Sequence, residues 1–123
     1  MKVLLSIKPQ FANKILSGEK LYEYRKRIFK KDVDTVLIYS TKPVGYVIGE
    51  FKIDRIIHDD KKLVWDQTKL YSGITHEFYE EYFNDYAEAY AIKIKSVKKY
   101  NTPIKLNDIK PNLKAPQSYC YIS

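Results

Sequence analysis

The chain has 123 residues, 45% of them hydrophobic and 15% aromatic, and its formal net charge is +7. This length fits one domain, and the aromatic content argues against an intrinsically disordered chain. A single cysteine, Cys120, excludes an internal disulfide, and no apolar run approaches the roughly 18 residues of a membrane span. Because the N-terminal apolar stretch is also too short for a signal peptide, we expect one cytoplasmic domain over residues 1–123, not bound to a membrane.

The excess positive charge lies in the first quarter of the chain. Residues 1–31 contain nine Lys and Arg residues but only two Glu, whereas bases and acids balance in the remainder. Such clustering is typical of proteins that bind a polyanion, because each neutralised phosphate releases counterions. A solvated basic face that only aids solubility is the alternative. The charge therefore favours a nucleic-acid partner and does not require one.

The first elements have clear boundaries. Residues 3–7 form an apolar run suited to a buried strand. Pro9 fits the first position of a helix, where its missing N–H costs nothing, and Ser17-Gly18 predicts the end of that helix. We expect its inward face to consist of Phe11, Ile15 and Leu16.

Strands follow this helix. From Leu21 the residues alternate, which places Tyr22 and Tyr24 on one face and Glu23, Arg25 and Arg27 on the other. Residues 36–39 predict a second strand, and residues 46–57 a longer one with a bulge or close approach at Gly49.

The second half combines helices and strands. Residues 65–71 predict a short helix ending near Gly73, and Thr75 can cap the next helix. That helix carries an aromatic stripe, which we interpret mainly as core: Phe78, Tyr79, Tyr82 and Phe83. Residues 91–97 and 118–122 read as strands, the last of which could close a barrel. Together these elements predict an α+β fold, a mixed β-barrel with two or three short helices.

Several kinds of site have no support in the sequence. His58, His76 and Cys120 lack partners at metal-ligand spacing, so we expect no metal. There is no phosphate loop or dinucleotide fingerprint, and we expect no cofactor. Cys120 fits a small buried hydrophobe better than a nucleophile.

The most distinctive segment is Gly18-Glu19-Lys20-Leu21-Tyr22-Glu23-Tyr24-Arg25. A lysine beside a turn, with a carboxylate and a guanidinium on one strand face, can hold a planar polar ligand: Arg provides a rigid fork of donors, and Glu accepts from an exocyclic amine. A partly desolvated lysine could also act as a general base. The alternative is a solvated strand face with a weak Glu–Arg pair. Spacing alone leaves both interpretations open.

The pattern Gly18-x-Lys20-x-x-Glu23-x-Arg25, preceded by Leu5-Ser6-Ile7-Lys8-Pro9, resembles the ASCH domain signature. Later landmarks extend the resemblance over nearly the whole chain: Gly49-Glu50-Phe51, Tyr71-Ser72-Gly73-Ile74 and Pro116-Gln117-Ser118-Tyr119. The resemblance implies a PUA-like barrel with a cleft beside the first helix that binds RNA or a modified nucleobase. It implies that Lys20, Glu23 and Arg25 lie in this cleft, that Ser6 and Lys8 flank it, and that Lys26 and Arg27 contact phosphates outside it.

Two functions follow from the resemblance. One is a non-catalytic module that binds RNA or a modified nucleoside. The other is hydrolysis of N4-acetylcytidine to cytidine and acetate, as some small ASCH proteins perform with a lysine in the same turn. In this alternative Lys20 is the base and Glu23, which stands where those enzymes have threonine, carries the proton to the leaving amine. The oligomeric state does not follow from the sequence, and an interaction domain with a vestigial cleft is a third possibility.

Overall fold

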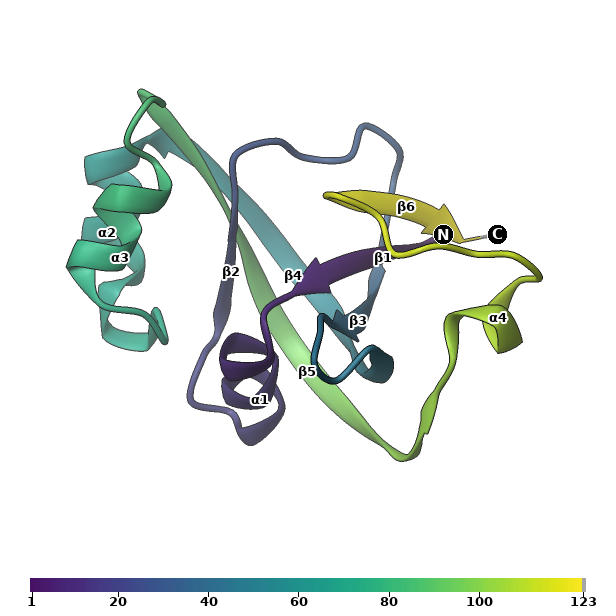
Figure 1. Ribbon diagram of the computed structural model, residues 1–123. Helices are drawn as coiled ribbons and strands as arrows, with labels where there is room; N and C mark the ends of the chain where they lie inside the picture. The colour runs from purple at the N-terminus through teal and green to yellow at the C-terminus, as the bar shows by residue number, and fades with distance from the viewer. Residues whose placement is uncertain (123) are drawn as a thin grey trace.

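The computed structural model describes residues 1–122 and contains one six-stranded mixed sheet with helices at its margins (Figure 1). The elements in chain order are β1 (Lys2–Ile7), α1 (Pro9–Ser17), β2 (Tyr22–Arg25), β3 (Thr35–Ser40), β4 (Tyr46–Asp60), α2 (Lys61–Thr68), the 3₁₀ helix η1 (Lys69–Tyr71), α3 (His76–Tyr82), β5 (Glu88–Ile104), α4 (Leu106–Ile109) and β6 (Tyr119–Ile122). The predicted α+β class is confirmed. No helix within residues 1–122 is long and apolar enough to cross a membrane.

The sheet is open. Its strand order is β2-β5-β4-β3-β1-β6, with β1 and β3 parallel and the other neighbours antiparallel. β6 pairs with β1 but not with β2, so the prediction of a closed barrel is wrong. Side chains replace the missing ladder: the Arg25 guanidinium on β2 donates to the carbonyl oxygens of Ser6 and Ser118, and Phe29 and Val33 of the β2–β3 loop are buried in the main core.

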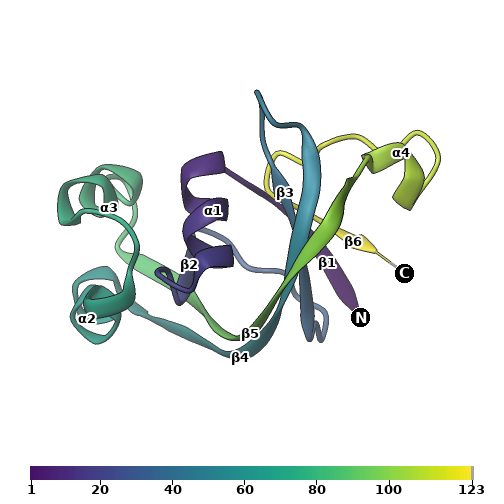
Figure 2. The same ribbon diagram turned by 90° about the horizontal axis from the view of Figure 1, so that it is seen from below.

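Three apolar clusters hold the elements together. The main core lies between the sheet and α1 and contains Val3, Ile15, Ile38, Phe51 and Ile92. A second core packs α2 and α3 against β2 and β5, and a third lies beneath α4 and the C-terminal segment. Figure 2 shows α2 and α3 together at one end of the long β4–β5 ribbon and α4 toward the other end.

Local signals explain the elements that the sequence predicted well. Gly18 ends α1 with φ +87°, a left-handed conformation that favours glycine. Thr75 caps α3, because its hydroxyl accepts from the Phe78 amide at 3.0 Å. The β4 register shifts between Val47 and Gly49, and a Cβ at Gly49 would lie 2.7 Å from the Lys98 carbonyl oxygen. The bulge and the close approach at Gly49 are thus confirmed.

The helix count and several boundaries differ from the predictions. The described chain has four α-helices and one 3₁₀ helix where two or three helices were expected. α2 begins at Lys61 instead of Trp65, because Asp60 accepts from the Lys62 amide and caps it there. β5 continues to Ile104, and the short helix α4 was not predicted.

Candidate functional site

A cavity of about 310 Å³ opens between the end of β1, α1, β2 and α3. Its walls are formed by Ser6, Ile7, Lys8, Phe11, Lys20, Glu23, Tyr24, Arg25, Ile74, Phe78, Tyr82 and Gln117. Five of the seven predicted site residues line it: Ser6, Lys8, Lys20, Glu23 and Arg25. Lys26 and Arg27 do not line it. Most of the site residues predicted from the sequence therefore line one cavity. The sequence analysis did not identify the wall opposite them, which α3 provides.

Lys20 is a buried lysine with only 1% of its surface exposed. Its ammonium donates to the Ser72 carbonyl oxygen at 2.5 Å and lies 4.7 Å from the centre of the Tyr24 ring. Burial lowers the pKa of Lys20 to about 8, an effect that the nearby Glu23 carboxylate partly offsets. This lysine therefore changes charge just above neutral pH, inside a cavity.

The absence of a side chain at Gly73 makes room for the Lys20 side chain. Gly73 has φ +69°, and a Cβ there would lie 2.5 Å from Lys20 Cβ and Cγ. We expect Gly73→Ala to reduce the free energy of unfolding by about 2–4 kcal/mol, because left-handed strain and overpacking add. Gly18→Ala is the matched control: it has φ +87° but no atom within 4 Å of the added Cβ, so only strain of about 1–2 kcal/mol is expected. Denaturant unfolding measures both, and equal losses would contradict the close contact with Lys20.

Glu23 and Arg25 are buried on β2, with 6% and 8% of their surfaces exposed, so this is not a solvated strand face. Arg25 Nη1 lies 3.3 Å from Glu23 Oε2 and 3.3 Å from the Ser6 carbonyl oxygen, and Nη2 donates to the carbonyl oxygen and hydroxyl of Ser118 at 3.1 and 2.9 Å. Most of the guanidinium donors are therefore directed at the chain itself. Arg25 positions Glu23 and connects the edge strand β2 to β1 and to the residue that precedes β6.

Arg25→Lys tests this bridging role. Lysine keeps the charge but loses the planar fork, so two or more of the hydrogen bonds cannot form together. We expect the free energy of unfolding to fall by about 2 kcal/mol. Arg27→Lys, at an exposed position just beyond β2, should change it by less than about 0.5 kcal/mol. Urea denaturation of the two variants makes the comparison, and an unchanged Arg25→Lys midpoint would argue against the bridge.

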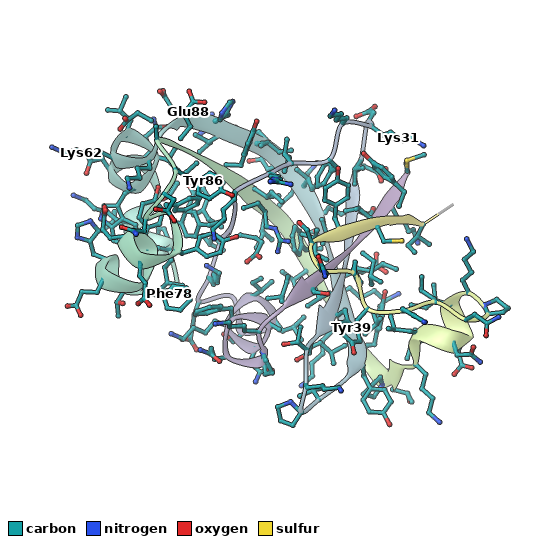
Figure 3. The ribbon with its side chains drawn as sticks, turned by 45° about the horizontal axis from the view of Figure 1, so that its top comes forward. Lys31, Tyr39, Lys62, Phe78, Tyr86 and Glu88 are labelled. Atoms are coloured by element: carbon teal, nitrogen blue, oxygen red, sulfur yellow. The ribbon has the colours of Figure 1, made fainter. Side chains whose placement is uncertain are left out.

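The aromatic stripe of α3 divides between core and cavity. Tyr79 and Phe83 are fully buried, as the core interpretation predicted, but Phe78 and Tyr82 line the cavity. Phe78, labelled in Figure 3, meets the Phe11 ring of α1 edge-on with 5.0 Å between centroids. The helical spacing of the stripe could have indicated that two of its members share a face distinct from that of the other two.

Two lysines cover the rings on the cavity wall. The Lys8 ammonium lies 5.3 Å from the centre of the Phe78 ring. The Lys26 ammonium lies 4.6 Å from the centre of the Tyr82 ring and 5.3 Å from that of Tyr86. Lys26 is therefore next to the cavity wall without lining it, whereas Arg27 is exposed to solvent. The arrangement places cationic groups beside flat aromatic faces at the margin of the cavity.

Other groups that sequence analysis considered lie elsewhere. Within residues 1–122, no three His, Cys, Asp or Glu side chains are grouped as they would be to hold a metal ion. His58 and His76 are each near a single glutamate, at 3.3 Å and 3.2 Å. Cys120 is half-buried in the cluster beneath α4, on β6.

The chain matches known proteins along most of its length. A family model described as the ASCH domain matches residues 5–98. An ASCH domain-containing ribonuclease from Zymomonas mobilis is 29% identical over 128 residues, which cover 98% of this chain and 84% of that protein. The crystal structure of ASCH from Zymomonas mobilis matches with a TM-score of 0.92 and 28% identity, covering 99% of this chain and 87% of that one.

A further relative extends the comparison to a protein of another kind. The ATP synthase subunit alpha of Ureaplasma parvum is 31% identical over 121 residues, which are 98% of this chain but only 15% of that protein. The match is thus to one part of a much longer chain. With the family model, the sequence relatives and the fold in agreement, the protein described here belongs to the ASCH domain family.

Proposed function

We propose that this ASCH domain binds RNA and receives a nucleobase in the cavity between β1, α1, β2 and α3. The observation that carries the proposal is the combination of Lys20, a buried cationic donor, with the acceptor Glu23 in a cavity walled by aromatic rings. A base needs such polar groups at its edge and apolar groups against its faces. Within residues 1–122, only Arg25 pairs with Glu23, through one carboxylate oxygen, which leaves the other for an exocyclic amine.

The charge pattern supports a polymer as the ligand. Lys8 lines the cavity, and Lys26 lies beside its wall. Arg27, the next residue, is exposed to solvent. Phosphates on either side of a bound nucleotide would therefore meet cations. The Zymomonas mobilis relative carries the name ribonuclease, a class that acts on RNA, which supports the same class of ligand here. A free modified nucleoside would use the cavity but not these outer cations.

Fluorescence anisotropy with an unstructured single-stranded RNA tests the proposal. We expect the logarithm of the affinity to fall linearly with the logarithm of the salt concentration, by about 0.7 for each phosphate contacted. Lys20→Ala should weaken binding, whereas Lys62→Ala, at an exposed position on α2, removes the same charge away from the cavity and should leave it unchanged. Binding that does not depend on salt would contradict the phosphate contacts.

Hydrolysis of the bound nucleotide is a second candidate, and the lowered pKa of Lys20 favours it. A lysine with a pKa of about 8 is partly unprotonated at neutral pH and can accept a proton from water. With N4-acetylcytidine, the activated water would attack the acetyl carbon, the C–N bond would break, and Glu23 would carry the proton to the leaving amine, releasing cytidine and acetate. The sequence resemblance suggested this substrate.

Chromatography after incubation with N4-acetylcytidine, and in parallel with single-stranded RNA, separates the catalytic outcomes. Cytidine and acetate formed by the wild-type protein but not by Lys20→Ala would support the amidohydrolase. RNA fragments with the same dependence would instead support a ribonuclease like the Zymomonas mobilis relative. Intact substrates, together with RNA binding in the anisotropy assay, would leave the binding module alone.

A further inference from the structure

The loop of residues 26–34, which we call the seam loop, crosses the open side of the sheet from β2 to β3 (Figure 1). Phe29 and Val33 point inward, with 6% and 9% of their surfaces exposed, and belong to the main core. The basic residues between β2 and Phe29, and just after it, are half-buried or exposed: Lys26, Arg27, Lys30 and Lys31. Because apolar side chains fill the opening, the cations of this loop are presented to solvent.

Both ends of this cationic stretch meet tyrosines. At one end the Lys26 ammonium lies 4.6 Å from the centre of the Tyr82 ring, which is part of the cavity wall. At the other end the Lys31 ammonium lies 4.9 Å from the centre of the Tyr121 ring on β6. The amides of Lys30 and Lys31 also donate to the Tyr121 hydroxyl, at 2.8 and 3.1 Å. The loop therefore forms a continuous connection from the cavity to the far edge strand.

The chemistry of this connection fits single-stranded RNA. Proteins that hold single strands combine cations along the backbone path with aromatic faces on which bases stack. Here four cations occur within six residues, and a tyrosine ring stands at each end. Five residue steps separate Lys26 from Lys31, which limits the path to about 18 Å, enough for more than one nucleotide. An acidic peptide could pair with the lysines, but its carboxylates would not stack on the tyrosine rings as bases do.

We propose that an RNA strand with one base in the cavity continues along the seam loop and stacks a second base on Tyr121. This inference rests on the proposed function and adds a second contact surface to it. Lys30 and Lys31 bind phosphates, and the Lys31 side chain moves aside from the Tyr121 ring to admit the base. The cavity alone then determines affinity for a very short RNA, whereas the seam loop adds affinity for a longer one.

Anisotropy with two RNAs, one of three nucleotides and one of roughly 12, tests this surface. The double variant Lys30→Ala/Lys31→Ala should reduce the salt slope for the longer RNA by about 1.4, which corresponds to two phosphates. Tyr121→Leu should weaken the longer RNA roughly 5- to 150-fold, the range measured for loss of one stacked base. Neither variant should change the affinity for the trinucleotide.

Two matched controls separate this role from general charge and from loop anchoring. Lys110→Ala/Lys114→Ala removes two exposed lysines near α4 and should leave the salt slope unchanged. Tyr121→Phe keeps the ring but loses the hydroxyl that accepts from the loop amides, and it should lose much less affinity for the longer RNA than Tyr121→Leu does. If Tyr121→Phe loses as much affinity as Tyr121→Leu, the tyrosine only anchors the loop and the stacking proposal is overturned.

The two RNAs also distinguish failure of this inference from failure of the proposed function. Trinucleotide binding that depends on Lys20, with no gain for the longer RNA, overturns the seam-loop surface alone. No binding of either RNA by the wild-type protein overturns the proposed function and this inference with it. Circular dichroism identifies any variant that fails to fold. If the double lysine variant does not fold, the single variant Lys31→Ala, which changes an exposed side chain, provides the same salt readout with an expected slope change of about 0.7.

Discussion

Replacing Lys20 with methionine is expected to weaken RNA binding roughly 10- to 150-fold, the range for loss of a hydrogen bond from a charged donor. Methionine fills much of the same space, so the effect reports the ammonium and not a cavity. In the wild-type protein, affinity should also fall as the pH rises through about 8, because burial lowers the pKa of Lys20 to that value and the cationic form is lost above it. Titration by anisotropy at several pH values measures both effects.

The direction of the pH effect separates binding from catalysis. A bound ligand that needs the ammonium loses affinity above pH 8, whereas a reaction that needs the free amine as base becomes faster until the lysine is fully deprotonated. Lys62→Met is the control, because Lys62 is exposed on α2 and its loss should leave the pH profile unchanged. An affinity that stays constant across this range would mean that the Lys20 ammonium does not contact the ligand.

Elements with strong local signals could be predicted from the sequence. Pro9 and Gly18 define α1, and Thr75 marks the start of α3, because each acts within one turn of its own position. The start of α2 was missed, since the Asp60 cap is itself the last residue of β4 and no loop separates the strand from the helix. Such a boundary depends on the residue at which a long strand stops pairing with its neighbour, and the local sequence pattern does not predict that residue.

Closure of the sheet could not be predicted for a similar reason. β2 and β6 are the two edge strands of the sheet, and whether they pair depends on what fills the space between them. Phe29, Val33 and the Arg25 side chain occupy that space, so the edges stay apart. Alternation alone predicts a strand but not its partner.

The candidate site was predicted in part. The spacing of Lys20, Glu23 and Arg25 and the resemblance to ASCH domains placed them together, and the cavity includes all three. The sequence did not indicate that the Arg25 guanidinium would donate hydrogen bonds to Ser6 and Ser118, since Ser118 lies 93 residues away. The opposite wall of Phe78 and Tyr82 was missed because helical spacing identifies an apolar face but not what it covers.

The second large effect is expected on stability, again at Lys20. The pKa of Lys20 is lowered from 10.5 to about 8 by burial, so the folded protein releases this proton at a lower pH than the unfolded chain does. Between these values the unfolded state holds one more proton, and the free energy of unfolding therefore rises with pH, by about 1.4 kcal/mol per pH unit. The destabilisation is fully present below pH 8, and about 3 kcal/mol of it is relieved by pH 10.5.

Comparing the wild type with Lys20→Met isolates this contribution. Burial also raises the pKa values of Tyr24 and Tyr79, which lowers stability at high pH, but both proteins share these groups and the effect cancels in the difference. We expect the wild type to gain about 2.4 kcal/mol relative to the variant between about pH 7.5 and 10 in urea unfolding. Parallel curves would show that the ammonium is not desolvated. A confirmed gain would mean that the ionised lysine weakens the fold at neutral pH in spite of its hydrogen bond to Ser72, as expected of a residue kept for a ligand and not for stability.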